Sequence, residues 1–122
     1  MKRIVPLLAT ALLIFAACGE PEADRIGLGA ECGSDDDCHE DLDCLQDFGG
    51  GYCGLSGCEA HADCPDYSSC VEYDDDSTYC FRDCENKAEC NANRSRDREA
   101  NCSSNIDFVE PTDLRACVPP SS

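Results

Sequence analysis

Twelve of the thirteen cysteines fall into three consecutive sets of four, and this arrangement constrains the fold more than any other feature of the chain. The first two sets share the spacing C-x5-C-x5-C-x(8–9)-C, and the third keeps the opening C-x5-C but lengthens both later gaps. Because a repeated spacing indicates a repeated structural unit, we expect three tandem modules. Their cysteines are Cys32, Cys38, Cys44 and Cys53; Cys58, Cys64, Cys70 and Cys80; and Cys84, Cys90, Cys102 and Cys117.

The chain has little apolar material with which to stabilise a fold by burial alone. Its hydrophobic fraction is 42%, but this figure includes the 13 cysteines, and there is no tryptophan. Small exported domains without a sufficient core depend on disulfides, each of which contributes roughly 3 kcal/mol for a loop of about 15 residues. We therefore expect two disulfides in each module. Four cysteines permit three pairings, and we favour first-to-third with second-to-fourth because interlocked loops compact a module.

Each module is predicted to combine an exposed loop with a short β-hairpin. The openings 33–37, 59–63 and 85–89 are polar and end in an acid, as exposed loops often do. The predicted fold class is therefore small and disulfide-rich: tandem four-cysteine modules of loops and short β-hairpins, with little helix beyond the N-terminal segment. The hairpin turns are expected at 49–51, 74–77 and 110–113, the last between strands at 106–109 and 114–117.

The N-terminal segment has the form of an export signal. Lys2 and Arg3 precede an apolar run from Ile4 to Ala17. This run is shorter than the about 20 helical residues that a bilayer core requires, so a permanent membrane span is the weaker interpretation. The predicted organisation is a signal at 1–17, a polar tether at 18–29, and modules at 30–57, 58–83 and 84–122.

The end of the apolar run, Phe15-Ala16-Ala17-Cys18, resembles the lipobox of bacterial lipoproteins, in which two small residues precede an obligatory cysteine. The resemblance implies that residues 1–17 are removed and that Cys18 carries diacylglycerol and an amine-linked acyl chain such as palmitate. It also implies a lipid anchor in the bacterial cell envelope, and Gly19 favours the outer membrane. The odd cysteine count agrees, because Cys18 is the thirteenth. A secreted protein that is cut one or two residues later is the alternative.

The first two modules resemble the cysteine-rich repeats of the Dickkopf N-terminal region and EB modules. The likeness covers residues 32 to 84 and consists of acidic C-x5-C openings and a Tyr-Cys near the close of each set. The third module departs from this pattern. We carry over no signalling or receptor function, because a similar fold does not transfer a site.

The chain is strongly acidic, with a formal net charge of −17 that becomes −19 when Lys2 and Arg3 leave with the signal. This charge excludes nucleic acid, or anionic lipid bound through a general basic face, as a partner. The third module is the least acidic, because Arg94, Arg96 and Arg98 lie in its long insert. We interpret this insert as a contact loop for an anionic protein or surface partner. The alternative is a solvated loop whose arginines pair with Asp97 and Glu99.

Metal chemistry has weak support. Zinc sites use C-x(2–4)-C pairs, whereas the recurring gap here is five residues, and no C-x-x-C redox pair is present. The acidic clusters 35–37 and 74–76 raise a calcium hypothesis, but neither has EF-hand spacing and consecutive acids point in different directions. We therefore expect neither a metal site nor a cofactor other than the covalent lipid.

Catalysis also has weak support, and we expect no enzyme. The two histidines, His39 and His61, lie in predicted loops, and His61 is close in sequence to Asp63, Ser68 and Ser69 without a nucleophile-elbow motif. The sequence therefore predicts a membrane-anchored lipoprotein with a binding or structural ectodomain. The alternative is a calcium-binding or catalytic exported protein that uses the acidic loops with His39 and His61.

Overall fold

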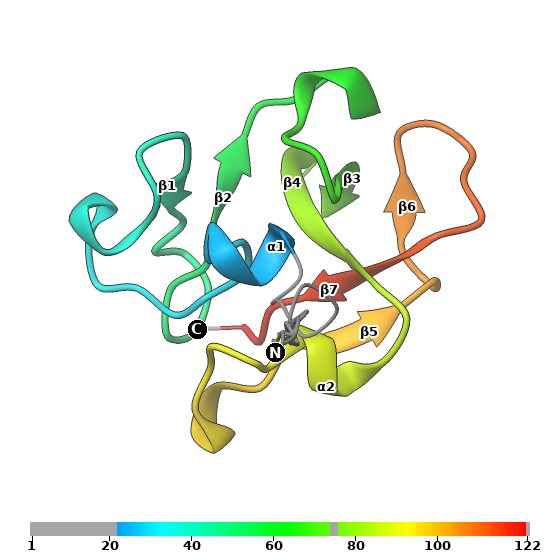
Figure 1. The fold of residues 1–122 in the computed structure, drawn as a ribbon. Coiled ribbons are helices and arrows are strands. Elements are labelled where there is room, and N and C mark those ends of the chain that lie inside the picture. The colour runs from blue at the N-terminus through cyan, green and yellow to red at the C-terminus, as the bar shows by residue number, and fades with distance from the viewer. Residues whose placement is uncertain (1–21, 74–75, 122) are drawn as a thin grey trace, which may run out of the picture.

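Antiparallel strands form the framework of the protein, which the computed structural model describes over residues 22–73 and 76–121. Seven strands form one sheet with the path β1-β2-β4-β3-β6, and β7 joins it by pairing with both β4 and β5. Figure 1 shows β1 and β2 on one side of β4, and β3 and β6 on the other. The strands are β1 (Asp43–Cys44), β2 (Cys53–Ser56), β3 (Ser68–Tyr73), β4 (Ser77–Cys84), β5 (Asn101–Ser103), β6 (Asp107–Phe108) and β7 (Arg115–Val118).

Between residues 22 and 121, as far as the structure describes them, helix is limited to single turns, in agreement with the predicted fold class. The two α-helical turns are α1 (Glu22–Arg25) and α2 (Lys87–Cys90), and 3-10 turns occupy Asp35–Asp37, His61–Asp63 and Arg96–Arg98. The three cysteine-set openings are exposed for most of their length, as predicted. Each of them contains one of these helical turns rather than an irregular loop.

Six disulfides hold this framework together. In every module the first cysteine pairs with the third and the second with the fourth, which is the pairing that the sequence favoured. The enclosed sequence separations run from 12 to 27 residues. The bonds are Cys32–Cys44, Cys38–Cys53, Cys58–Cys70, Cys64–Cys80, Cys84–Cys102 and Cys90–Cys117.

The first two predicted hairpins are confirmed. β1 pairs with β2 across the glycine turn, with Cys44 opposite Cys53. β3 pairs with β4 in a register that places Cys70 opposite Cys80. The turn between β3 and β4 includes residues 74 and 75, which lie outside the described residues.

The third predicted hairpin is wrong. β6 pairs with β3 of the second module, with Phe108 opposite Val71, and β7 pairs with β5 and β4. The apolar residues Ile106 and Phe108 pack against the shared core, where Val71 is fully buried. Burial against this neighbouring module outweighs a local turn, because a two-residue strand has little surface of its own to bury.

The modules share one core instead of forming separate units. Phe48 of the first module contacts the rings of Tyr73, Tyr79 and Phe81 of the second at centroid distances of 5.0 to 6.0 Å. Ala116 and Cys117 of the third module belong to the same buried cluster. The tandem description therefore holds for the disulfides but not for the packing.

The described part of the predicted tether, 22–29, belongs to the folded domain. Ala23 and Leu28 are buried beside Leu42 and Cys53 in a second core cluster. The Gly29 N–H donates to the Cys53 carbonyl at 2.9 Å. Residues 22–29 therefore do not form a free tether, and the rest of the predicted tether, 18–21, lies outside the described residues.

Candidate interaction surfaces

The Arg94 side chain points into its own molecule. Its guanidinium donates from Nη1 to the carbonyls of Gly29 and Gly51, at 3.1 and 2.8 Å, and from Nη2 to that of Gly49, at 2.8 Å. It lies 5.8 Å from the centre of the Tyr52 ring, within range of a cation–π interaction. Burial lowers the pKa of Arg94. Arg94 therefore joins the third module to the first, which corrects the prediction that it contacts a partner.

The glycine turn of the first module allows this close approach. Gly50 and Gly51 have φ values of +79° and +75°, a region that favours glycine. A Cβ at Gly51 would lie 2.1 Å from the Cys32 carbonyl oxygen, and one at Gly50 would lie 2.8 Å from Arg98 Cγ. The turn can therefore present its carbonyls to Arg94 only if these two positions lack a side chain.

The exposed cations of the insert are Arg96 and Arg98. The insert is held against the first module by Glu31, whose carboxylate accepts the Ser95 N–H. This hydrogen bond is the main cause of a lowered pKa at Glu31, and the charges of Arg94 and Arg98 add to it. The alternative prediction paired Glu99 with an arginine of the insert. In the structure Glu99 Oε1 instead lies 3.0 Å from Lys87 Nζ. The contact hypothesis therefore applies to Arg96 and Arg98 alone.

His61 occupies a structural position between the second and third modules. Its Nδ1 accepts the Cys70 N–H at 3.0 Å, so Nε2 carries the proton and donates to the Glu110 carbonyl at 3.1 Å. Its own N–H donates to the Glu110 carboxylate at 2.6 Å, and its ring meets Phe108 edge-on at 6.3 Å. Nδ1 therefore bonds within the second module, while Nε2 and the backbone N–H hold the 106–110 segment.

The serines near His61 in sequence do not join it in a catalytic arrangement. Ser68 Oγ donates to the Pro65 carbonyl at 2.6 Å, and Ser69 Oγ donates to Asp83 at 2.5 Å. Asp63 accepts backbone N–H groups of its own opening. His39 is exposed and its Nδ1 accepts the Asp41 N–H at 3.2 Å.

The acid before the second cysteine of each set has a structural role that the sequence analysis missed. Asp37 Oδ2 accepts the N–H groups of Gly33 and Ser34 at 2.8 and 3.2 Å. Asp63 and Glu89 make equivalent bonds in the other two openings. The signal was available, because a carboxylate at this spacing from the start of a helical turn is a capping pattern.

Two carboxylates of the acidic cluster 35–37 likewise accept hydrogen bonds from main-chain N–H groups. Asp35 Oδ1 accepts the Cys44 N–H at 2.8 Å, while Asp37 caps the opening as described. In the second cluster, residues 74 and 75 lie outside the described residues, and Asp76 is exposed with a φ of +65°. Two of the described carboxylates in these clusters are thus already hydrogen-bond acceptors.

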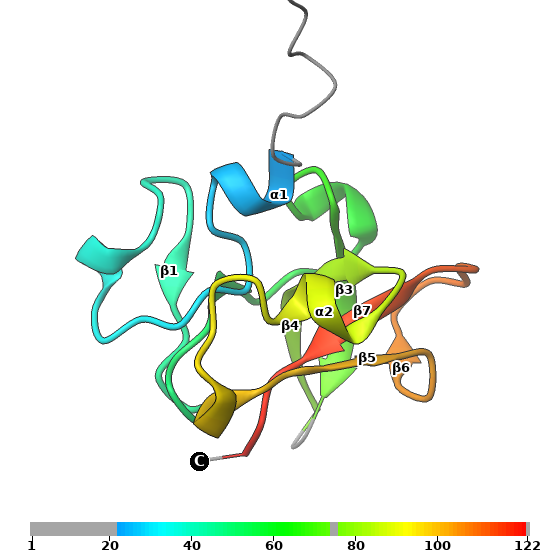
Figure 2. The same cartoon turned by 60° about the horizontal axis from the view of Figure 1, so that its bottom comes forward.

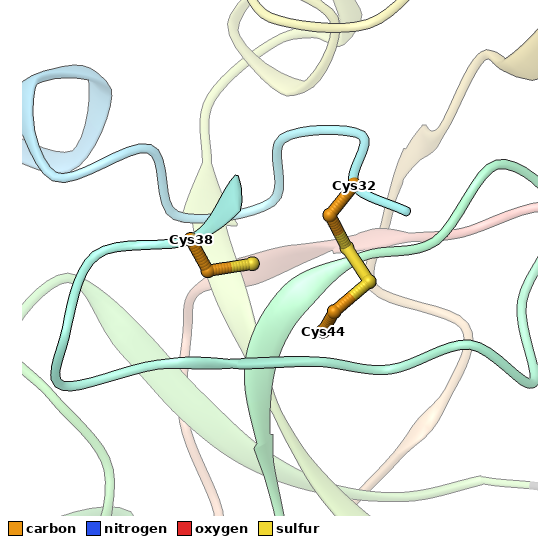
Figure 3. Close-up of side chains that lie close together, drawn as sticks. All are labelled: Cys32, Cys38 and Cys44. Carbon is orange, nitrogen blue, oxygen red and sulfur yellow. A yellow bond between two sulfur atoms is a disulfide. The ribbon is translucent and has the colours of Figure 1, made fainter. Parts of the chain in front are cut away.

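Three groups of cysteine sulfurs lie close enough to suggest a metal site by distance alone. The Sγ atoms of Cys32, Cys38 and Cys44 lie within 4.8 Å of one another, and Figure 3 shows the Cys38 sulfur pointing toward the Cys32–Cys44 bond. The other two groups are Cys58, Cys64 and Cys80, and Cys84, Cys90 and Cys102. Every one of these sulfurs belongs to a disulfide, and it is the thiolate that ligates metals. The grouping reflects interlocked disulfides.

A shallow groove crosses the surface beside α1. Tyr67 and Leu114 line it together with Ala23, and they are the large apolar side chains that are exposed within residues 22–73 and 76–121, at 54% and 49%. Asp83 and Glu89 lie along the same groove. Burial raises the pKa of Asp83, and its hydrogen bond from Ser69 opposes this shift.

No protein-family model, curated protein sequence or solved structure matches this chain. Within the part of the chain that the structure describes, no helix is both long enough and apolar enough to cross a bilayer.

Proposed function

We propose that this protein is an exported bacterial lipoprotein that is anchored in the cell envelope through Cys18. The observation that carries the proposal is that the other cysteines are all paired in disulfides. All twelve of them, from Cys32 to Cys117, form six intramolecular disulfides. Cys18 is the thirteenth and follows an export signal with a lipobox-like end, so lipidation accounts for the residue that pairing leaves over.

The disulfides support an extracytoplasmic location. Structural disulfides persist in oxidising compartments and are rare in the cytoplasm. Gly19 favours the outer membrane by analogy with other lipoproteins.

We propose a binding or structural role for the ectodomain instead of catalysis. This is supported by the engagement of the two ring nitrogens of His61 and of the Ser68 and Ser69 hydroxyls in structural hydrogen bonds. The exposed cations Arg96 and Arg98 offer an anionic partner a contact on an otherwise acidic molecule.

Mass spectrometry of the protein from a bacterial membrane fraction tests the anchor. The expected species begins at Cys18, carries diacylglycerol and an acyl chain, and has no free thiol. Cys18→Ser should lose the lipid and leave the membrane fraction. Phe15→Leu, which restores the commoner lipobox residue, is the matched control and should be lipidated normally. A mature chain that begins after Cys18 and is recovered in the soluble fraction would contradict the proposal.

Capture from envelope extracts tests the contact role. Replacing Arg96 and Arg98 together by Ala should weaken retention of a specific partner on the immobilised ectodomain. Replacing Asp97 by Ala, between them, should leave retention unchanged or strengthen it. Equal retention by the parent, the double arginine variant and the Asp97→Ala variant would show that Arg96 and Arg98 do not contact the partner.

A further inference from the structure

The folded domain begins very close to the proposed anchor. Ala23 is already buried in the second core cluster, five residues after Cys18. Five residues span at most about 18 Å even when fully extended. The part of the domain that contains Ala23 is therefore confined to the neighbourhood of the headgroups whenever Cys18 carries lipid.

The surface around Ala23 suits such a position. The groove beside α1 contains Tyr67 and Leu114, the exposed large apolar side chains of the described residues. Tyrosine is enriched at membrane–water interfaces, because its ring is apolar and its hydroxyl remains hydrated. The short linker and the two exposed apolar side chains are independent observations that point to the same face.

The charges of the groove restrict the type of lipid. Asp83, Glu85 and Glu89 line it together with Arg82. Carboxylates are repelled by anionic headgroups, and the whole mature chain carries the same sign. A zwitterionic surface is therefore the chemistry that this face fits.

We propose that the face beside α1 that exposes Tyr67 and Leu114, the anchor face, rests on the zwitterionic headgroup region of the membrane that holds the lipid on Cys18. This inference rests on the proposed lipidation. It sets the orientation of the whole molecule. In Figure 2 the turn Arg96–Arg98 and the C-terminus lie at the edge opposite α1, so this turn lies away from the membrane.

The absence of tryptophan from the chain allows a direct test. Tyr67→Trp and Leu114→Trp each place a single tryptophan on the anchor face, and Ser121→Trp places one near the C-terminus as the matched control. Each lipidated full-length protein is reconstituted into phosphatidylcholine vesicles that contain a lipid brominated near the headgroup end of its chains. Tryptophan quenching and emission wavelength are then measured with and without the brominated lipid.

The anchor-face tryptophans should be quenched several-fold more strongly than the control and should emit at shorter wavelength. Added phosphatidylglycerol should reduce this quenching, and high salt should restore it. If the protein carries its lipid and floats with the vesicles but all three tryptophans are quenched equally, the orientation is wrong and the anchor stands. If no lipid is found on Cys18 and the protein does not float, the proposed anchoring fails and the orientation fails with it.

Discussion

The Tyr52 hydroxyl donates a buried hydrogen bond of 2.9 Å to the Cys117 carbonyl, 65 residues further along the chain. The same oxygen accepts the Arg82 N–H at 2.9 Å. One phenol thus connects the three cysteine modules, whose disulfides each join cysteines of the same module. Burial raises the pKa of Tyr52, so the hydroxyl stays protonated at physiological pH and remains a donor.

Tyr52→Phe should destabilise the oxidised ectodomain by about 1–3 kcal/mol, because the Arg82 N–H and the Cys117 carbonyl would both be left buried without this partner. Urea unfolding with the disulfides intact measures the change. Tyr67→Phe removes a hydroxyl from an exposed ring and is the matched control. Equal stability of the two variants would show that the Tyr52 hydroxyl does not connect the modules.

Arg94→Ala should cost roughly 2–3 kcal/mol, since charge-assisted bonds to the carbonyls of Gly29, Gly49 and Gly51 would be lost. Arg94→Lys should recover only part of this stability, because an ammonium cannot reach several carbonyls with a planar fork. Arg96→Ala, two residues away on the surface, is expected to change stability by less than about 0.5 kcal/mol. Should Arg96→Ala be the more harmful change in thermal unfolding, the assigned roles would be reversed.

Asp37→Ala should destabilise the first module by about 0.5–2 kcal/mol through loss of the cap on Gly33 and Ser34. The neighbouring Asp36→Ala should have little effect, because Asp36 is an exposed residue of the same turn. Amide hydrogen exchange of residues 33 and 34 reports the cap directly. Protection that is unchanged in Asp37→Ala would exclude a capping role.

Glu31 should contribute stability that depends on pH. The pKa of Glu31 is lowered in the folded protein, so its contribution is present above the unfolded value of about 4.3 and is lost as the pH falls through the folded pKa. Glu31→Gln should therefore be less stable than the parent at pH 7, and the difference should shrink toward pH 3. Denaturant midpoints across this range provide the measurement.

The contribution of Asp83 to stability should depend on pH in the opposite direction. Burial raises its pKa, so its contribution is greatest below the unfolded value of about 3.9 and is lost as the pH rises through the folded pKa. Asp83→Asn keeps an oxygen that can accept from Ser69 and should gain stability relative to the parent as the pH rises from 3 to 7. A constant difference over this range would argue against a raised pKa.

Features that depend on residues close together in the chain were predictable. The confinement of the disulfides to each set, the exposed openings and the first two hairpins follow from local spacing, because closing a loop of 12 to 27 residues brings its ends together at little entropic cost. The C-x5-C openings and the Gly49–Gly51 turn already contain the residues that those structures require.

Features that depend on contacts between modules were decided only by the tertiary structure. Phe108 pairs with the second module instead of its own, residues 22–29 join the core instead of forming a tether, and Arg94 binds the carbonyls of a distant turn. An arginine, a polar linker and a short apolar strand have the same local pattern whether they face solvent or another module. Which of these they face is determined by the sum of burial and hydrogen bonding over surfaces that meet only when the whole chain has folded.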